Sequence, residues 1–154
     1  MTTTTLWDAT ADDIVTVADF VRDFYALDDT PYDRDNVVRV LSDIVGDATL
    51  GRVWLIMVDG DPAGYLVLTF GYSLEYRGRD CFIDELFIVQ RHRGGGVGTA
   101  VIGLVADAAQ SLRVHAIHLE VDRENYHAQA LYRKTGFGGP ERFLLTRWLV
   151  QGVE

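Results

Sequence analysis

Residues 81–99, CFIDELFIVQRHRGGGVGT, constrain the fold more than any other stretch of this chain. Phe82 to Val89 form an apolar run of strand length that is interrupted only by Asp84 and Glu85. A charged turn and four glycines follow, and a helical pattern of apolar residues begins at once. A strand that enters a helix through a glycine turn leaves several backbone N–H groups free at the positive end of the helix dipole. The stretch therefore predicts an anion site, and phosphate groups are the usual ligands of such sites.

The spacing of the glycines excludes two common phosphate loops. A Walker A loop requires a lysine before its final Ser or Thr, and residues 94–99 contain no lysine. A dinucleotide loop has the form G-x-G-x-x-G, and here its last glycine would fall on Thr99 or Val101. The pattern that remains is Arg-x-x-Gly-x-Gly, over residues 93–98.

Hydrophobic periodicity predicts an α/β chain in the order β-α-α-β-β-β-α-β-α-β. The expected strands are residues 4–9, 52–58, 63–75, 81–89, 115–121 and 143–150, with a further short strand after residue 137. The expected helices run from Thr10, as N-cap, to about residue 26, and over residues 33–46, 96–112 and 125–135. An antiparallel meander enters the strand at 81–89 and a β-α-β unit leaves it, so we expect a mixed sheet.

Length and charge narrow the class of protein. A chain of 154 residues predicts a single domain over residues 1–154. The net charge is −9, and −8 of it lies in residues 1–50, where eleven Asp face three Arg. Such a surface disfavours nucleic acid and attracts cationic partners, although most of these side chains are expected simply to be solvated.

The sequence also predicts a cytoplasmic protein without a membrane partner. No stretch approaches the roughly 18 apolar residues of a membrane span, and the polar N-terminus has no signal-peptide pattern. Cys81 is the single cysteine, which excludes an internal disulfide framework. It has no marked partner base, so we expect a buried apolar residue rather than a nucleophile. The four histidines have no metal-ligand spacing, so no metal is expected.

Two motifs in register resemble the GNAT family, the GCN5-related N-acetyltransferases. The first is the strand FIDELFIV with its Arg-x-x-Gly-x-Gly turn, residues 82–98. The second is NYHAQALYRKTGF, residues 125–137, which looks like the family's Asn-initiated helix that ends in Leu-Tyr-x-x-x-Gly-Phe. Arg91 departs from the pattern, because many members have proline there. The resemblance implies the GNAT fold, with a mixed central sheet flanked by helices on both faces, and a homodimer by family habit.

The resemblance also implies acetyl-CoA as co-substrate. The strands at 81–89 and 115–121 would splay apart, pantothenate would lie in the gap, and the pyrophosphate would lie on the glycine turn. The residues implied for this site are Leu86, Phe87, Ile88, Arg93, Gly94, Gly95, Gly96, Val97, Gly98, Thr99, Asn125 and Ala128.

In the family an amine attacks the thioester directly, and Tyr132 is the implied general acid for the leaving thiolate. Asn125 and Tyr132 are seven residues apart and share a helix face. Asp84 and Glu85 are the candidate bases. Strand alternation points them to opposite faces unless a bulge intervenes, so either carboxylate, or a water relay, remains open.

The acceptor pocket in this family is walled by the segment between the first two helices. Here that segment carries Tyr25, Asp28, Asp29 and Tyr32, and Asp84 falls where polyamine-acetylating members carry an acceptor-contacting Glu. Acids beside tyrosines suit a cationic amine, although they also suit a polar connection. We expect an acetyltransferase for a small cationic primary amine, polyamine-like or aminoglycoside-like. The alternatives are a protein N-terminal or lysine acetyltransferase, and a non-catalytic acyl-CoA-binding or regulatory module.

Overall fold

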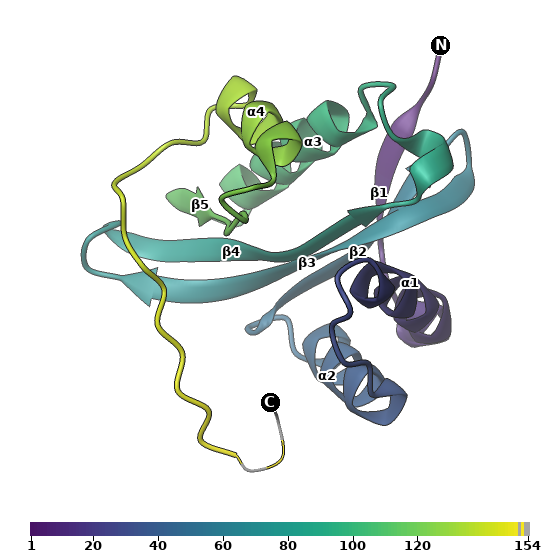
Figure 1. The fold of residues 1–154 in the computed structure, drawn as a ribbon, viewed down its shortest axis with the longest axis horizontal. Coiled ribbons are helices and arrows are strands. Elements are labelled where there is room, and N and C mark those ends of the chain that lie inside the picture. Colours follow the sequence, from purple (N-terminus) through teal and green to yellow (C-terminus); the bar gives the residue numbers. More distant parts are fainter. Residues whose placement is uncertain (151, 153–154) are drawn as a thin grey trace.

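The computed structural model describes residues 1–150 and 152. The strands are β1 (Thr4–Asp8), β2 (Gly51–Val58), β3 (Asp61–Ser73), β4 (Gly78–Ile88) and β5 (Ala116–His118). The α-helices are α1 (Ile14–Ala26), α2 (Arg34–Gly46), α3 (Val97–Ser111) and α4 (Tyr126–Lys134). Short 3-10 turns cover Ala11–Asp13 and Gln90–His92. The strands form one mixed sheet in the order β1-β2-β3-β4-β5, in which only β4 and β5 are parallel (Figure 1).

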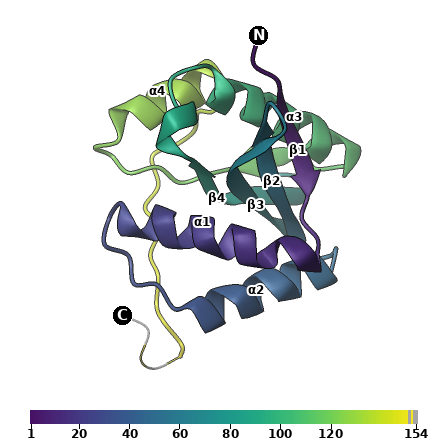
Figure 2. The same cartoon turned by 90° about the vertical axis from the view of Figure 1, so that its right-hand side faces the viewer.

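Helices cover both faces of this sheet, as Figure 2 shows from the side: α1 and α2 lie on one face, and α3 and α4 on the other. Alternation along the strands supplies two separate cores. Ile56, Leu66 and Leu68 are buried with α3, whereas Leu55, Tyr65 and Val67 are buried with α1 and α2. The predicted α/β fold with a mixed central sheet is thus confirmed.

Local signals fix the element boundaries where side chains bond to the backbone. Before α1, the Thr10 N–H donates to Asp13 Oδ2 at 2.9 Å, and before α2 Asp33 Oδ1 accepts from the Asn36 N–H at 3.2 Å. The β2–β3 hairpin turns through Asp59-Gly60 with φ of 51° and 86°, as a two-residue turn of this type requires.

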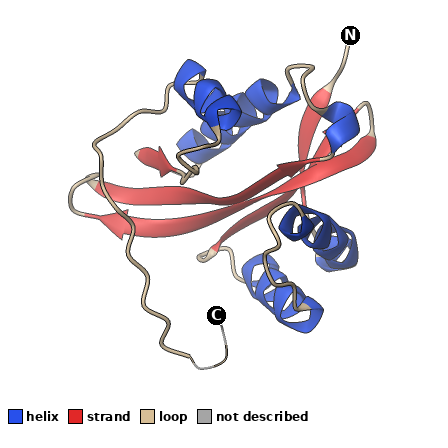
Figure 3. Ribbon diagram, viewed as in Figure 1, coloured by secondary structure: helices blue, strands red, loops and turns tan. Residues whose placement is uncertain are grey.

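The C-terminal part corrects the predicted topology. The strand expected at 143–150, and the further one after Phe137, are not formed in the described residues: the chain from Gly138 is extended, without regular structure (Figure 3). The strand expected at 115–121 shortens to Ala116–His118. The apolar sequence alone favoured a strand at 143–150, but a strand also needs a neighbour, and Arg142 bonds to Glu75 instead.

We call residues 138–150 the C-terminal arm. It leaves α4 on one side of the sheet, passes the β3–β4 turn and reaches the other side (Figure 1). Arg142 tethers it by bonds of 2.9 and 3.0 Å to the two carboxylate oxygens of Glu75.

Candidate functional site

The parallel pairing between strands β4 and β5 ends after three positions. Asp80–Phe82 pair with Ala116–His118, and β4 then runs on to Ile88 without a partner on that side in the part of the chain described. The end of this pairing is consistent with the divergence that the GNAT resemblance implied, and a cofactor lying in it stays a prediction.

Backbone amides of β4 point into this divergence. The Val89 N–H donates to the Ala63 carbonyl at 2.8 Å, and bonding alternates along an antiparallel pair, so Leu86 and Ile88 direct their amides away from β3. Arg93 Nε donates to the Ile88 carbonyl at 2.6 Å, which agrees with that direction. The Leu86 and Ile88 N–H groups are therefore placed for a ligand in the gap.

Phe87 has a different place from its two neighbours. Its ring is buried on the α1 side, 5.6 Å from the Phe24 ring, and the Arg93 guanidinium lies 5.5 Å from its centroid. Packing accounts for this residue, and a contact with cofactor stays a prediction.

The glycine turn has the free donors that its sequence predicted. Gly94 and Gly96 adopt left-handed φ angles of 80° and 84°, which favour glycine. Among the hydrogen bonds of the described residues, none is donated by a backbone N–H of residues 94–99. A Cβ at Gly94, Gly95 or Gly96 would meet nothing within 4 Å, so no other part of the described chain packs closely on the side-chain positions of this turn. Unbonded backbone donors at a helix N-terminus fit a pyrophosphate.

Gly98 serves packing rather than binding space. A Cβ there would lie 3.0 Å from Leu131 Cδ2 of α4, so glycine allows α3 and α4 to approach each other closely. This contact holds α4 beside the glycine turn.

The helix α4 carries the predicted Asn and Tyr. Asn125 Oδ1 accepts the Ala128 N–H at 3.1 Å, so this side chain caps the helix, and its role toward cofactor stays a prediction. The half-buried Tyr132 packs 5.8 Å from Phe137, and burial raises the pKa of its phenol. Its hydroxyl has no hydrogen-bond partner among the described residues, so the proton of this phenol remains available.

A β-bulge lies at the two strand acids. Val67 pairs with Glu85 and Leu68 pairs with Ile83, so Asp84 is an extra residue in β4. Burial is the main cause of the raised pKa of both Glu85 and Tyr25, and the charge of Asp84 adds to each shift. This bulge is the exception that the expectation of opposite faces allowed for, so strand alternation does not decide how the two acids are directed.

The two acids differ in their surroundings. Glu85 Oε2 accepts from the Tyr25 hydroxyl at 2.6 Å and Oε1 from the Tyr65 hydroxyl at 2.8 Å. Burial raises the pKa of Glu85 while both phenol bonds oppose that shift, and burial and Glu85 raise the pKa of both phenols. Asp84 is exposed, has no hydrogen-bond partner in the described chain, and its pKa is raised by partial desolvation. Asp84 is therefore the acid with free oxygens.

Only some residues of the connection between α1 and α2 lie near the two strand acids. Tyr25 reaches Glu85, and its ring lies 6.3 Å from that of Tyr32, whose hydroxyl donates to the Ala18 carbonyl at 3.0 Å. Asp28 is exposed, accepts from Thr30, and its charge raises the pKa of Tyr25. Asp29 lies in an exposed left-handed turn with φ of 56°. Tyr25 and Asp28 thus lie near the strand acids, whereas Asp29 shows no such contact.

Tyr65 is a site residue that the sequence did not single out. It sits in a run of buried apolar residues, where a tyrosine predicts packing. Only the register of β3 against β4 reveals it, because Tyr65 and Glu85 are diagonal neighbours across the strands.

The remaining candidates carry no chemistry of this kind. Burial raises the pKa of Cys81 to about 11, so the thiol stays protonated, as expected of a packing residue. In residues 1–150 and 152 there is no cluster of three or more His, Cys, Asp or Glu able to hold a metal ion. No helix in that same part of the chain is long and apolar enough to cross a membrane.

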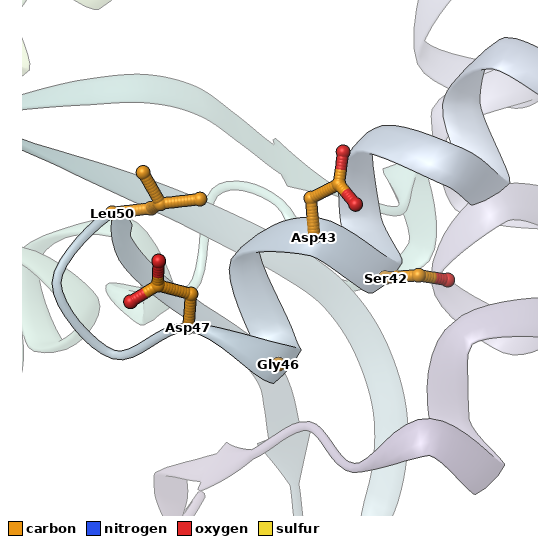
Figure 4. A pocket seen from close by; sticks show the side chains of 5 residues that line it. All are labelled: Ser42, Asp43, Gly46, Asp47 and Leu50. Atoms are coloured by element: carbon orange, nitrogen blue, oxygen red, sulfur yellow. The ribbon is translucent and has the colours of Figure 1, made fainter.

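Surface hollows lie away from the strand acids. One of about 640 Å³ is lined by Asp122 to Asn125, before α4. Another of about 380 Å³ lies at the end of α2, beside Asp47 and Leu50 (Figure 4). Neither includes the strand acids or the glycine turn, so the site rests on the strand divergence.

Comparisons with known proteins agree with this geometry. The acetyltransferase (GNAT) family profile matches residues 16–137. The chain is 28% identical over 86 residues to thialysine N-epsilon-acetyltransferase of Bos taurus, covering 53% of this chain and 51% of that one. It is 27% identical over 131 residues to an uncharacterized N-acetyltransferase of Archaeoglobus fulgidus, covering 84% and 88%. The match thus spans about half the length of the thialysine enzyme.

Solved structures extend the likeness to the whole fold. An integron cassette protein from the mobile metagenome of Cole Harbour Salt Marsh superposes with a TM-score of 0.84 at 29% identity, covering 96% of this chain and 92% of that one. An aminoglycoside N-acetyltransferase in complex with CoA gives 0.80 at 14% identity, covering 97% of each chain, which is a likeness of fold alone.

Proposed function

Because this chain belongs to the acetyltransferase (GNAT) family, we propose that it transfers an acetyl group from acetyl-CoA to a primary amine of a small cationic acceptor. The observation that carries the proposal is the bulged strand beside the divergence. On one side β4 offers free amides and a glycine turn to the cofactor, and beside them it presents Asp84 with free oxygens.

In the proposed cofactor site, the backbone N–H groups of residues 94–99 hold the pyrophosphate. The amides of Leu86 and Ile88 hold the pantetheine arm and the thioester carbonyl, whose oxygen gains negative charge in the transition state. Asn125 and Ala128 border the arm from α4. Acetyl-CoA is a co-substrate here, and no metal takes part in the proposal.

The chemical step needs a neutral amine and a protonated leaving group. The amine nitrogen attacks the thioester carbon, a C–N bond forms, and the C–S bond breaks. Tyr132 donates its proton to the leaving thiolate, and its raised pKa supports this role because the phenol stays protonated at neutral pH. Asp84 binds the acceptor ammonium, while Glu85 orients Tyr25 beside it.

The acceptor class follows from charge. The charges of Asp84 and Asp28 both act on the Tyr25 phenol, and a cation bound here would gain from both carboxylates and from an aromatic face. The thialysine enzyme, which is similar over about half of its length, is named for acetylation of an ε-amine, which also supports an alkyl ammonium acceptor.

Thiol release from acetyl-CoA over a panel of amines tests the proposal, with the product identified by mass spectrometry. The panel holds polyamines, thialysine, an aminoglycoside, and peptides with a free N-terminus or lysine. Turnover of the small cations is expected. Tight CoA binding without acceptor-dependent thiol release would favour the regulatory module, and turnover of peptides alone would favour a protein acetyltransferase.

A matched pair of variants tests the role of Asp84. Asp84→Asn should raise KM for a cationic acceptor about ten-fold or more, since it removes a charge partner at a partly desolvated site, and leave KM for acetyl-CoA unchanged. Asp107→Asn, an exposed change on α3, should alter neither constant. Equal acceptor KM values in the two variants would remove Asp84 from the acceptor site.

We also propose a homodimer that buries the C-terminal arm of each copy along the open edge of β5 in its partner. Phe143, Leu144, Leu145, Trp148, Leu149 and Val150 are all exposed. Apolar residues on both sides of an extended segment call for a neighbour on each side. Light scattering should give a dimer for the full chain and a monomer for Trp148→Glu, whereas Leu74→Glu in the β3–β4 turn should stay dimeric. A monomeric full chain would refute this assembly.

A cytoplasmic location is likewise a proposal. It is supported by the free, buried thiol of Cys81, because free cysteines are typical of reducing compartments. Fractionation of the source cells tests it.

A further inference from the structure

A second titratable pair lies outside the residues assigned above. His118 ends β5, and its Nε2 lies 2.9 Å from Oδ2 of Asp80 in β4. Their side chains retain only 19% and 11% of their exposure, so the pair is largely withdrawn from water.

The surroundings hold this imidazole in one orientation. The His118 ring lies 4.4 Å from the Tyr76 ring, edge to face, and 4.9 Å from the tilted Phe82 ring. On the far side of Asp80, a Cβ at Gly71 would come 2.6 Å from Oδ1, so glycine leaves room for the carboxylate. A ring held between aromatics and a fixed carboxylate can rotate little.

The chemistry of the pair decides where the free lone pair lies. An ionised carboxylate only accepts hydrogen bonds, so Nε2 of a neutral His118 carries the hydrogen and donates it to Asp80. The lone pair is then on Nδ1, which has no hydrogen-bond partner among the described residues. Nδ1 is also not among their buried unsatisfied atoms, so it is open to solvent. An imidazole oriented by a carboxylate, with its other nitrogen open, is the arrangement of a general base.

The pair lies on the face where the acceptor is proposed to bind. Cys81, Ile83 and Ile117 face the α3 core, so alternation directs Asp80, Phe82 and His118 to the opposite face. The two strands diverge just beyond this point. His118 pairs with Phe82, two residues before Asp84, and at about 3.3 Å per residue this places it ~7 Å along the strand from Asp84. One or two waters span such a distance.

We propose that His118, oriented by Asp80, takes up the proton that the acceptor ammonium loses before the amine attacks. This step rests on the proposed acetyl transfer. An N–H bond of the ammonium breaks, and an N–H bond forms at Nδ1 through bridging water. After attack, the nitrogen gives its second proton to the Tyr132 phenolate, so one proton per turnover leaves through His118 to solvent.

The charges around the ring favour this role. Asp80 bonds to it from β4, the Tyr76 ring packs on it from the β3–β4 turn, and Glu75 of that turn adds a second negative charge nearby. Arg142 pairs with Glu75 at 2.9 Å, and Asp84 lies further along β4. Asp80 is thus the carboxylate that directly stabilises an imidazolium, while Asp84 holds the ammonium.

Three variants test the step through the pH dependence of kcat/KM. His118→Gln should lower kcat/KM at neutral pH by about 100-fold and remove the acidic limb of the profile, with acetyl-CoA affinity unchanged. Asp80→Asn keeps the ring but can donate to Nε2, which moves the hydrogen to Nδ1, so a comparable loss is expected. His127→Gln, an exposed change on α4, should keep the wild-type profile. An unchanged acidic limb in His118→Gln overturns the step while leaving the acetyl transfer in place.

A spectroscopic measurement is independent of turnover. Long-range ¹⁵N–¹H spectra of the neutral wild-type protein should show His118 with its hydrogen on Nε2, and Asp80→Asn should shift it to Nδ1. A wild-type hydrogen on Nδ1 would overturn the step even if every variant folded poorly. No turnover of any amine by the wild type would instead remove the acetyl transfer, and the step with it.

Discussion

The Tyr25 hydroxyl donates to Glu85 Oε2 at 2.6 Å, and this bond ties α1 to β4 across 60 residues of sequence. Tyr65 occupies the other oxygen of the same carboxylate at 2.8 Å. Glu85 is therefore held on both oxygens, whereas its neighbour Asp84 is held on neither. Glu85 is thus held in place by two tyrosines, whereas the adjacent Asp84 keeps both oxygens free to bind a ligand.

Tyr25→Phe should destabilise the protein by about 1.5–3 kcal/mol, because it removes a bond to a charged and largely buried carboxylate. Tyr32→Phe is the matched control, since its hydroxyl donates to the neutral Ala18 carbonyl and its loss should be about 1 kcal/mol. Urea unfolding of both variants measures the difference. A loss for Tyr25→Phe no larger than for Tyr32→Phe would contradict this account of Glu85.

The stability of the protein should depend on pH through Glu85. Burial raises the pKa of this carboxyl, so the folded state binds its proton more tightly than the unfolded state. The contribution of Glu85 to the free energy of unfolding is then most favourable below the ordinary glutamate pKa of about 4.3. That contribution is lost as the pH rises through the pKa that Glu85 has in the folded protein. The urea midpoint of Glu85→Gln relative to wild type should rise over that window. A difference that stays flat across that window for Glu85→Gln would refute the prediction.

Tyr132→Phe should lower kcat by about ten-fold or more and leave acetyl-CoA affinity unchanged, because the ring still packs on Phe137 while the proton donor is gone. Tyr126→Phe makes the same change at an exposed position of the same helix and should have no effect. Steady-state kinetics with the best amine of the panel measures both. Wild-type kcat in Tyr132→Phe would mean that the thiolate is protonated by another group.

Two glycine substitutions in α3 should change stability in opposite directions. Gly98→Ala forces a methyl group against Leu131 and should destabilise by about 1–3 kcal/mol. Gly103→Ala meets nothing within 4 Å and should stabilise by about 0.5–1 kcal/mol through helix propensity. Thermal unfolding compares the two variants. Equal unfolding temperatures would mean that Leu131 and α4 shift to accommodate the added methyl group at no cost in stability.

Much of the fold follows from local sequence signals. The Asp59-Gly60 turn, the Asp33 cap and the glycine turn after β4 each bond or bend within a few residues, so the sequence contains the whole cause. The C-terminal arm was predicted as a strand and is not one, because strand formation depends on a partner that local sequence does not contain.

The candidate site was predictable only where it is made of backbone. The free N–H groups of the glycine turn follow from its sequence, whereas the partners of Glu85 depend on the register of β3 against β4 and on the docking of α1. The pairing of Asp80 with His118 joins residues 38 positions apart in sequence, and the residues next to either one contain no signal that predicts it.

The extra residue at Asp84 changes the parity of β4. Before it, even-numbered residues such as Asp80 and Phe82 face the α1 side of the sheet; after it, odd-numbered residues such as Glu85 and Phe87 do. Deletion of Asp84 itself would remove the bulge and leave every other side chain on its present face, whereas a single-residue deletion elsewhere in the strand would exchange the faces of one of its halves. Any alignment or redesign of this strand must therefore count in two separate frames that meet at Asp84.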